Sequence, residues 1–215
     1  GNPKYILISL AFFTAIVSAF LDNVTTVILI MPVTFVIAKE LDINPIPFLI
    51  TEILASNIGG TATLIGDPPN IIIGSAAGLS FMDFIKELTG IVAAILIVNV
   101  GILTFIFRKQ LVAAKEKMEK VAQLDNSHTI TDKALMIRSG IVLLLVIIGF
   151  MLHDITHIQT CVTAMAGAAF LLLFEKPQKI FNEVEWNTIF FFIGLFIIIG
   201  GLEHAGGIKL MSEWL

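Results

Sequence analysis

Short polar segments interrupt a chain that otherwise consists of long apolar stretches. An apolar run over 5–20 is followed by the polar segment DNVTT at 22–26 and by a second apolar run over 27–38. Each run is shorter than the ~20 residues that a helix needs to cross a bilayer. Asp, Asn and Thr suit helix ends better than helix interiors, and Pro32 would disturb a continuous helix. We therefore predict a re-entrant hairpin over 5–38. One long helix that carries polar residues is the alternative.

The next apolar segment is broken in its middle by the sequence SNIGGTATLIGDPPNIII at 56–73. Its glycines permit unusual backbone conformations, and its two prolines prevent the helix from re-forming at once. Within a bilayer, an interrupted helix survives only where protein buries it or where it lines a polar cavity. Secondary transporters hold ions and substrates at such interruptions. We predict a broken membrane helix over 46–77 that carries a transport site, with a purely structural kink as the alternative.

The rest of the chain contains further apolar segments and one long hydrophilic segment. Ser80 and Asp83 form a capping-box pattern, which predicts an interfacial helix over 80–89 before a membrane span over 90–107. Residues 108–138 hold seven of the 13 Lys and Arg residues, so the positive-inside rule predicts a cytoplasmic linker there. Further membrane spans are expected at 139–152, 160–174 and 188–202.

The composition fits an all-α polytopic membrane protein. Hydrophobic residues make up 57% of the chain and charged residues 14%, and the mean hydropathy is +0.96. A net charge of −4 argues against a nucleic-acid partner, and the single cysteine, Cys161, excludes a disulfide within the chain. We expect a multi-pass protein of the inner or plasma membrane whose partners are the lipid bilayer and a small inorganic ion or anion. We do not expect an enzyme.

The candidate binding residues supply neutral or acidic oxygens, or flexible backbone, at the hairpin tip and in the helix break. Oxygen donors of this kind suit Na⁺ or protons. No Lys or Arg lies between Lys4 and Lys39 or between Lys39 and Lys86, which favours a cation, although helix N-termini can also bind carboxylates. The candidate substrate- and ion-binding residues are Asp22, Asn23, Thr25, Thr26, Asn57, Gly59, Gly60, Thr61, Thr63, Gly66, Asp67 and Asn70.

Two further expectations concern cations. Glu52 lies on the helix that leads into the break, and it is either a candidate proton relay or a residue near the cytoplasmic interface. We expect no resident cofactor and no metal site beyond Na⁺ at Asn23, Gly66 and Asp67. His153 and His157 are interpreted as loop residues rather than metal ligands.

Two motifs carry a family resemblance: SAFLDNVTTVILIMPVT at 18–34 and SNIGGTATLIGDPPNIII at 56–73. The chain resembles the family of arsenite permeases, NhaD-type sodium–proton antiporters and the pink-eyed-dilution protein. This family belongs to the ion-transporter superfamily, which also contains citrate and dicarboxylate carriers. The likeness extends over the whole chain, including VEWNTIFFFIGLFIIIGGLE at 184–203. In the family, the first motif is a re-entrant hairpin tip and the second is a break in the following helix, and together they form half of a binding site.

The resemblance implies a fragment of an inverted-repeat ion transporter. Residues 1–107 would be the later part of the first repeat, 108–138 the linker and 139–215 the start of the second repeat, whose own hairpin and break would lie beyond this chain. A homodimer is the candidate assembly, because dimers are common in the family. Dicarboxylate carriers usually have Ser-Asn-Thr at the hairpin tip, whereas residues 22–24 here are Asp-Asn-Val, which fits the antiporter and arsenite branch.

The expected function is therefore secondary active transport of an inorganic ion or small anion, of the arsenite and antimonite efflux or Na⁺/H⁺ antiport type, coupled to Na⁺ or H⁺. The first alternative is a Na⁺- or H⁺-coupled citrate or dicarboxylate carrier. The second alternative is a membrane sensor that has kept the fold and lost transport.

Overall fold

The computed structural model describes residues 2–113, 117–118, 133–174, 177–184 and 186–207, and these residues contain helices, turns and loops but no strands. The all-α class predicted above is thus confirmed. The chain divides into two compact units, Gly1–Thr163 and Ala164–Leu215.

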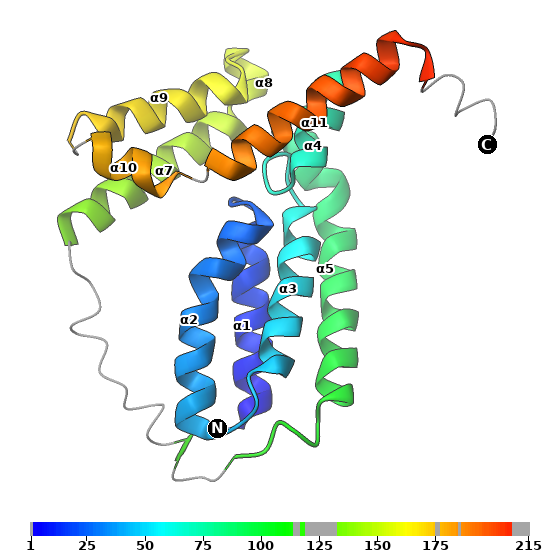
Figure 1. Ribbon diagram of the computed structural model, residues 1–215, viewed down its shortest axis with the longest axis vertical. Coiled ribbons are helices and arrows are strands. Elements are labelled where there is room, and N and C mark those ends of the chain that lie inside the picture. The colour runs from blue at the N-terminus through cyan, green and yellow to red at the C-terminus, as the bar shows by residue number, and fades with distance from the viewer. Residues whose placement is uncertain (1, 114–116, 119–132, 175–176, 185, 208–215) are drawn as a thin grey trace. The chain divides into compact units, whose positions relative to one another are not determined.

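Four long helices of the first unit lie side by side (Figure 1). These are α1 (Pro3–Ser18), α2 (Asn23–Leu41), α3 (Ile46–Gly60) and α5 (Phe81–Ile106), and the short α4 (Pro68–Ala77) lies at the end of this group where α1 meets α2. Helix α3 contacts α1, α2 and α5, so it is the central member of the group. Helices α7 (Lys133–Met151) and α8 (His153–Thr156) follow, and α7 contacts α5.

The predicted helical hairpin is confirmed, because α1 and α2 are two separate helices joined by a tight turn. The Asp22 carboxylate caps α2 by accepting hydrogen bonds from the N–H groups of Val24 (2.9 Å) and Thr25 (3.0 Å). Pro32 lies inside α2 and does not end it. Since α2 is long and apolar enough to cross a bilayer, the re-entrant depth of the hairpin stays a prediction.

The interfacial helix predicted over 80–89 is not a separate element. Helix α5 runs unbroken for 26 residues from Phe81 to Ile106, so the predicted boundary at Gly90 was wrong. The physical reason is that a single glycine weakens a helix by about 1 kcal/mol but does not end it without a proline or a cap. The predicted capping box is confirmed: the Ser80 hydroxyl accepts from the Asp83 N–H (3.2 Å), and the Asp83 carboxylate accepts from the Ser80 N–H (2.8 Å).

Replacing Ser80 by alanine is expected to destabilise the start of α5 by about 1 kcal/mol, because an orphan N–H of the first turn loses its acceptor. Hydrogen exchange at the amides of residues 81–84 measures this effect. Ser75→Ala, at an exposed position within α4, is the matched control. Equal exchange in the two variants would contradict the prediction.

Small residues allow α1, α3 and α5 to approach closely. Ala11 and Ala15 of α1, Ala55 of α3, and Leu96 of α5 belong to one buried cluster. A Cβ atom built on Gly59 of α3 would lie 2.1 Å from the Ala15 carbonyl oxygen, so the two backbones touch there. This kind of small-residue packing is typical of helices in membranes, where close van der Waals contact drives association.

The spans predicted in the second half correspond to helices with shifted ends. Helix α7 begins at Lys133, before the predicted start at 139, while α9 (Thr160–Leu172) and α11 (Trp186–His204) match the other two spans closely. The predicted loop at His153–His157 contains the one-turn helix α8. Helix α10 (Pro177–Glu183) precedes α11, and the Trp186 Nε1–H group donates to the Phe181 carbonyl at 2.8 Å.

Most of the predicted linker, residues 114–116 and 119–132, lies outside the described residues. Within its described part, the Lys117 Nζ lies 2.7 Å from the exposed Asp42 carboxylate. The hydrogen bond and the positive charge of Lys117 lower the pKa of the Asp42 carboxyl. The division of the chain into two repeats and a linker stays a prediction. Among the described helices, α2, α5, α7 and α11 are long and apolar enough to cross a membrane.

Candidate functional site

The hairpin tip and the helix break meet through the side chain of Asn23, the first residue of α2. Its amide nitrogen Nδ2 donates to the Asp67 carboxylate (2.8 Å) and to the Asn57 side-chain oxygen (3.3 Å). Its amide oxygen accepts from the Ser18 hydroxyl at the end of α1 (2.8 Å). One asparagine thus connects α1, α2, α3 and the residue that precedes α4.

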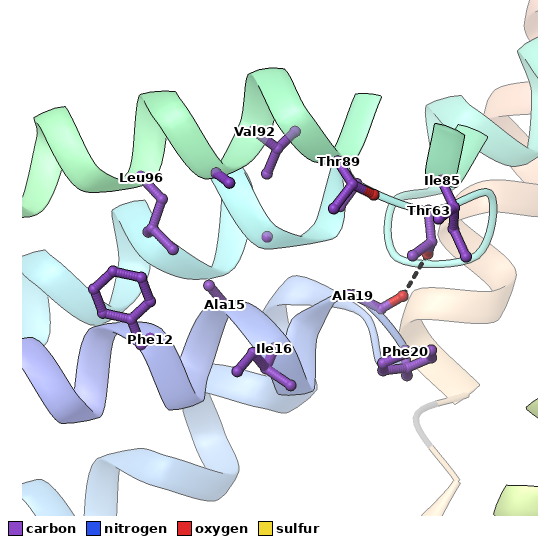
Figure 2. A pocket seen from close by; sticks show the side chains of 13 residues that line it. Phe12, Ala15, Ile16, Ala19, Phe20, Thr63, Ile85, Thr89, Val92 and Leu96 are labelled. Carbon is purple, nitrogen blue, oxygen red and sulfur yellow. Dashed lines mark hydrogen bonds between the residues drawn. The ribbon is translucent and has the colours of Figure 1, made fainter. Parts of the chain in front are cut away.

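The loop between α3 and α4 is attached to the hairpin by a second, independent bond. The Thr63 hydroxyl donates to the Ala19 carbonyl oxygen just after α1, as Figure 2 shows. The same hydroxyl accepts from the Gly66 N–H group (3.1 Å). Since Thr63 is buried, its bond to the Ala19 carbonyl attaches the loop to the hairpin tip in the interior of the unit.

Asn70 connects the two halves of the broken helix. Its Nδ2 group lies on α4 and donates to the backbone carbonyls of Thr63 (2.8 Å), Thr61 (3.3 Å) and Gly60 (3.5 Å). The last carbonyls of a helix have no partner within the helix, and inside a membrane they need one. The Asn70 side chain supplies it for the Gly60 and Thr61 carbonyls, which explains how the helix can be interrupted here.

Two glycines allow oxygen atoms to converge at the break. A Cβ atom built on Gly60 would lie 2.5 Å from the Asn23 side-chain oxygen and 2.9 Å from the Gly66 carbonyl oxygen. A Cβ atom on Gly66 would lie 2.4 Å from the Gly60 carbonyl oxygen and 2.8 Å from that of Ser18. Any larger residue would fill this cradle, so the glycines are needed for close approach rather than for an unusual φ.

The four helix ends at this site differ in the groups that they expose. Helices α1 and α3 end here and present carbonyl oxygens, whereas α2 and α4 begin here and would present N–H groups. The first N–H groups of α2 are bonded to the Asp22 carboxylate. Helix α4 begins with Pro68 and Pro69, which have no N–H group. The site is therefore rich in acceptors and poor in free backbone donors.

Asp67 is the acid of this site, and its carboxylate does not cap its own helix. It accepts from Asn23 instead, and the side chains of both residues are half-buried. Asn57 and Thr61 on the same side are exposed, so this arrangement opens to the surface of the unit. A small ion can reach the Asp67 carboxylate from that open side.

The structure thus brings most of the predicted site residues together. Asp22 serves as the cap of α2, and Gly59 packs against α1 just below the break. The Thr26 hydroxyl is buried on α2 without a hydrogen-bond partner among the described residues. Glu52 is buried in the middle of α3, farther from the break. For Thr25, the backbone N–H is bonded to Asp22. The residues that the tip and the break join directly are Asn23, Asn57, Gly60, Thr61, Thr63, Gly66, Asp67 and Asn70. Their roles as ion ligands stay predictions.

The sequence analysis missed the end of α1. The Ser18 side chain binds Asn23, its carbonyl oxygen faces Gly66, and the Ala19 carbonyl accepts from Thr63. A signal was present, because a serine stands at the end of an apolar arm four residues before the polar tip. Backbone carbonyls, however, carry no residue-specific signal.

A cavity of about 350 Å³ lies on the other side of the break, between α1, α3 and α5 (Figure 2). Its lining is almost entirely apolar and includes Phe12, Phe20 and Leu96. Of its polar lining residues, Thr63 turns its hydroxyl to the Ala19 carbonyl. The other polar lining residue, Thr89, offers a single hydroxyl, so the cavity does not supply the several oxygen atoms that an ion needs, and the candidate site is the tip itself.

Comparisons with known proteins show the family to which the chain is related. The family described as "Citrate transporter" matches residues 1–215. A protein of Mycobacterium tuberculosis named only as an uncharacterized transporter is 44% identical over 215 residues, which cover 99% of this chain and 50% of that protein. The magnetosome protein MamN of Magnetospirillum gryphiswaldense is 30% identical over 226 residues, covering 100% of this chain and 50% of MamN. The P protein of Sus scrofa is 27% identical, with 99% of this chain and 34% of the P protein covered.

The chain thus spans about half the length of the first two relatives and about a third of the P protein. The family match extends from the first residue to the last and includes the hairpin tip and the helix break. Together with the four helices that are long and apolar enough to cross a membrane, it identifies a multi-pass membrane protein. The chain belongs to the citrate transporter family of the ion-transporter superfamily.

Proposed function

We propose that this chain forms part of a secondary active transporter that exchanges Na⁺ for protons, with the cation bound at the Asp67 carboxylate. The observation that carries this proposal is the accessible, acceptor-rich meeting point of the hairpin tip and the helix break. It contains the Asp67 carboxylate, which accepts a hydrogen bond from Asn23, and several carbonyl oxygens that converge on the break. At the two helix N-termini, the first N–H groups of α2 are bonded to Asp22, and the first two residues of α4 are prolines without an N–H group. Hard oxygen donors of this kind suit Na⁺.

The exchange follows from the chemistry of one carboxylate. Ionised Asp67 attracts Na⁺. The carbonyl oxygens of Gly60 and Gly66 and the side-chain oxygen of Asn57 serve as further ligands of the cation. When a proton binds Asp67, the negative charge is lost and the cation is released. Because Na⁺ and H⁺ compete for one group, the site carries one or the other across the membrane in each step.

Citrate transport is the second candidate, because the family that matches the chain is described as "Citrate transporter". Citrate carries several carboxylates, so its site needs several hydrogen-bond donors or positive charges. The sequence has no Lys or Arg between Lys4 and Lys39 or between Lys39 and Lys86, the segments that form the hairpin tip and the break, and Pro68 and Pro69 remove donors from α4. These features place citrate behind Na⁺ in our proposal.

Asp67→Asn in a full-length protein that contains this chain is expected to abolish Na⁺-dependent proton movement in everted membrane vesicles. The amide keeps the size of the side chain but cannot bind a proton or balance a cation. The matched control is Asp42→Asn, because Asp42 is an exposed acid outside the site, and it should retain the signal. Retained exchange in Asp67→Asn would contradict the proposal.

Flux measurements with citrate and arsenite on the same full-length protein select between the alternatives. Citrate uptake that is lost in Asn23→Ala, without Na⁺-linked proton movement, would identify a citrate carrier. Arsenite efflux without either signal would identify the arsenite branch. Absence of flux for Na⁺, arsenite and citrate would favour the non-transporting sensor.

A further inference from the structure

Glu52 is an acid that the site at the hairpin tip does not use. Its side chain is 0% exposed in the middle of α3, the central helix of the first unit. One carboxyl oxygen is hydrogen-bonded to the Thr34 hydroxyl of α2. The other, Oε2, is buried and has no hydrogen-bond partner among the described residues.

No basic side chain neutralises this carboxyl group among the described residues. The titratable groups on the helices packed against α3 lie near the helix ends, and none is bonded to Glu52. A buried carboxylate with no counter-charge costs several kcal/mol, so the group has to hold a cation of its own. The titratable groups concerned are Lys4 and Tyr5 on α1, Lys39 and Glu40 on α2, and Asp83, Lys86 and Glu87 on α5.

The surroundings of Glu52 select the cation. Na⁺ binds several oxygen atoms at once, whereas the Thr34 hydroxyl is the only side-chain oxygen bonded to Glu52 within the part of the chain that the structure describes. A proton needs a single oxygen, and Oε2 has no competing partner in the described ranges of the chain. We propose that Glu52 is a second cation site in this chain and that it binds a proton.

The Glu52 site is separate from the hairpin tip. Gly60 follows Glu52 by eight positions along α3, which corresponds to about 12 Å and excludes a direct hydrogen bond. The buried residues Thr34, Ile30 and Thr26 follow one another at four-residue spacing on α2, so they form one stripe towards the tip. The middle member is apolar, and the stripe is therefore not a continuous chain of hydroxyls.

Full burial has a further consequence for proton exchange. Since Glu52 is 0% exposed, a proton enters or leaves only when helices packed against α3, among them α2 at the Thr34–Glu52 contact, move apart from it. Protonation of Glu52 is thereby tied to a movement of the hairpin on α3. The part that this movement plays in transport rests on the proposed function, whereas the proton site itself does not.

Infrared difference spectroscopy of the full-length protein in lipid, between acid and alkaline pH, tests the proton site directly. A carbonyl band of a protonated carboxylic acid is expected, which is lost in Glu52→Gln and kept in Glu40→Gln, a control at an exposed acid of α2. Thr34→Val should shift the band, because the carboxyl group loses its hydrogen bond. A band unchanged by both Glu52→Gln and Thr34→Val would overturn the proposal.

A transport measurement separates this inference from the proposed function. Glu52→Gln should lower proton-linked flux at least tenfold while Na⁺ still raises the thermal stability of the protein, because the tip remains intact. Asp67→Asn should lose the stabilisation by Na⁺ and keep the Glu52 band. If Glu52→Gln leaves the flux, its pH profile and the infrared band all unchanged, Glu52 is a structural hydrogen-bonding group and the inference fails, even where the Asp67 result supports exchange.

Discussion

Replacing Gly59 by alanine is expected to lower the free energy of unfolding by about 1–3 kcal/mol, the range typical of overpacked interiors. The new Cβ atom would lie 2.1 Å from the carbonyl oxygen of Ala15 and 2.5 Å from its Cα atom. Because these are backbone atoms, no side-chain rotation relieves the clash, and α1 has to move away from α3. Unfolding in mixed micelles, followed by circular dichroism, measures the loss.

Gly101→Ala is the matched control for this prediction. Gly101 lies inside α5, and a Cβ atom built there would meet nothing within 4 Å. Alanine is the better helix former by about 1 kcal/mol, so this variant should be as stable as the original protein or more stable. Equal destabilisation by the two substitutions would show that the contact between Gly59 and Ala15 does not hold α1 against α3.

The position of the candidate site could be predicted from sequence because its residues conflict with their surroundings. Asp67 and the two prolines that follow it lie between apolar stretches. An acid and two prolines are unfavourable inside an ordinary membrane helix, so their presence indicates a functional site. The same argument locates the hairpin tip at 22–26. Local chemistry also predicts the capping box of α5, since Ser80 and Asp83 are three residues apart.

The contacts between these segments could not be predicted, because they depend on how the helices approach one another. The bond between Asn23 and Asp67 joins residues 44 positions apart, and the Thr34–Glu52 bond joins α2 to α3 across a turn. That turn contains Asp42 with a φ of 53°, a left-handed conformation that is uncommon for a residue other than glycine. Sequence pattern gives neither this geometry nor the helix register that it determines.

The continuity of α5 illustrates a different limit. The change from an amphipathic to a uniformly apolar pattern near Gly90 describes a change of surroundings along the helix, not an end of the helix. Thr89 and Gly90 are of residue types that can cap a helix end, but α5 stays helical through both, so neither acts as a cap. The hydrophobic pattern therefore predicts what a helix contacts better than it predicts where the helix ends.

Replacing Asn23 by alanine is expected to weaken Na⁺ binding in a full-length protein about tenfold to a hundredfold. A hydrogen bond to a charged group contributes about 1.5–3 kcal/mol, and each 1.4 kcal/mol corresponds to a tenfold change in affinity. The variant removes the bond that orients the Asp67 carboxylate together with the bonds to Ser18 and Asn57. The Na⁺ concentration that gives half-maximal proton movement in everted vesicles measures the effect.

Asn23→Asp separates the orientation of Asp67 from the electrostatics of the site. Aspartate keeps an oxygen for the Ser18 hydroxyl but has no N–H group for Asp67, so two carboxylates would lie where a 2.8 Å hydrogen bond now joins Asn23 to Asp67. Like charges this close favour the uptake of a proton by one of them. Proton release, and with it the onset of Na⁺ exchange, should therefore move to higher pH than in the original protein. Asn44→Ala removes a comparable amide at the exposed start of α3. This control should change neither the half-maximal Na⁺ concentration nor the pH at which exchange begins. An unchanged pH profile in Asn23→Asp would mean that Asn23 joins the two motifs without acting on the coupling acid.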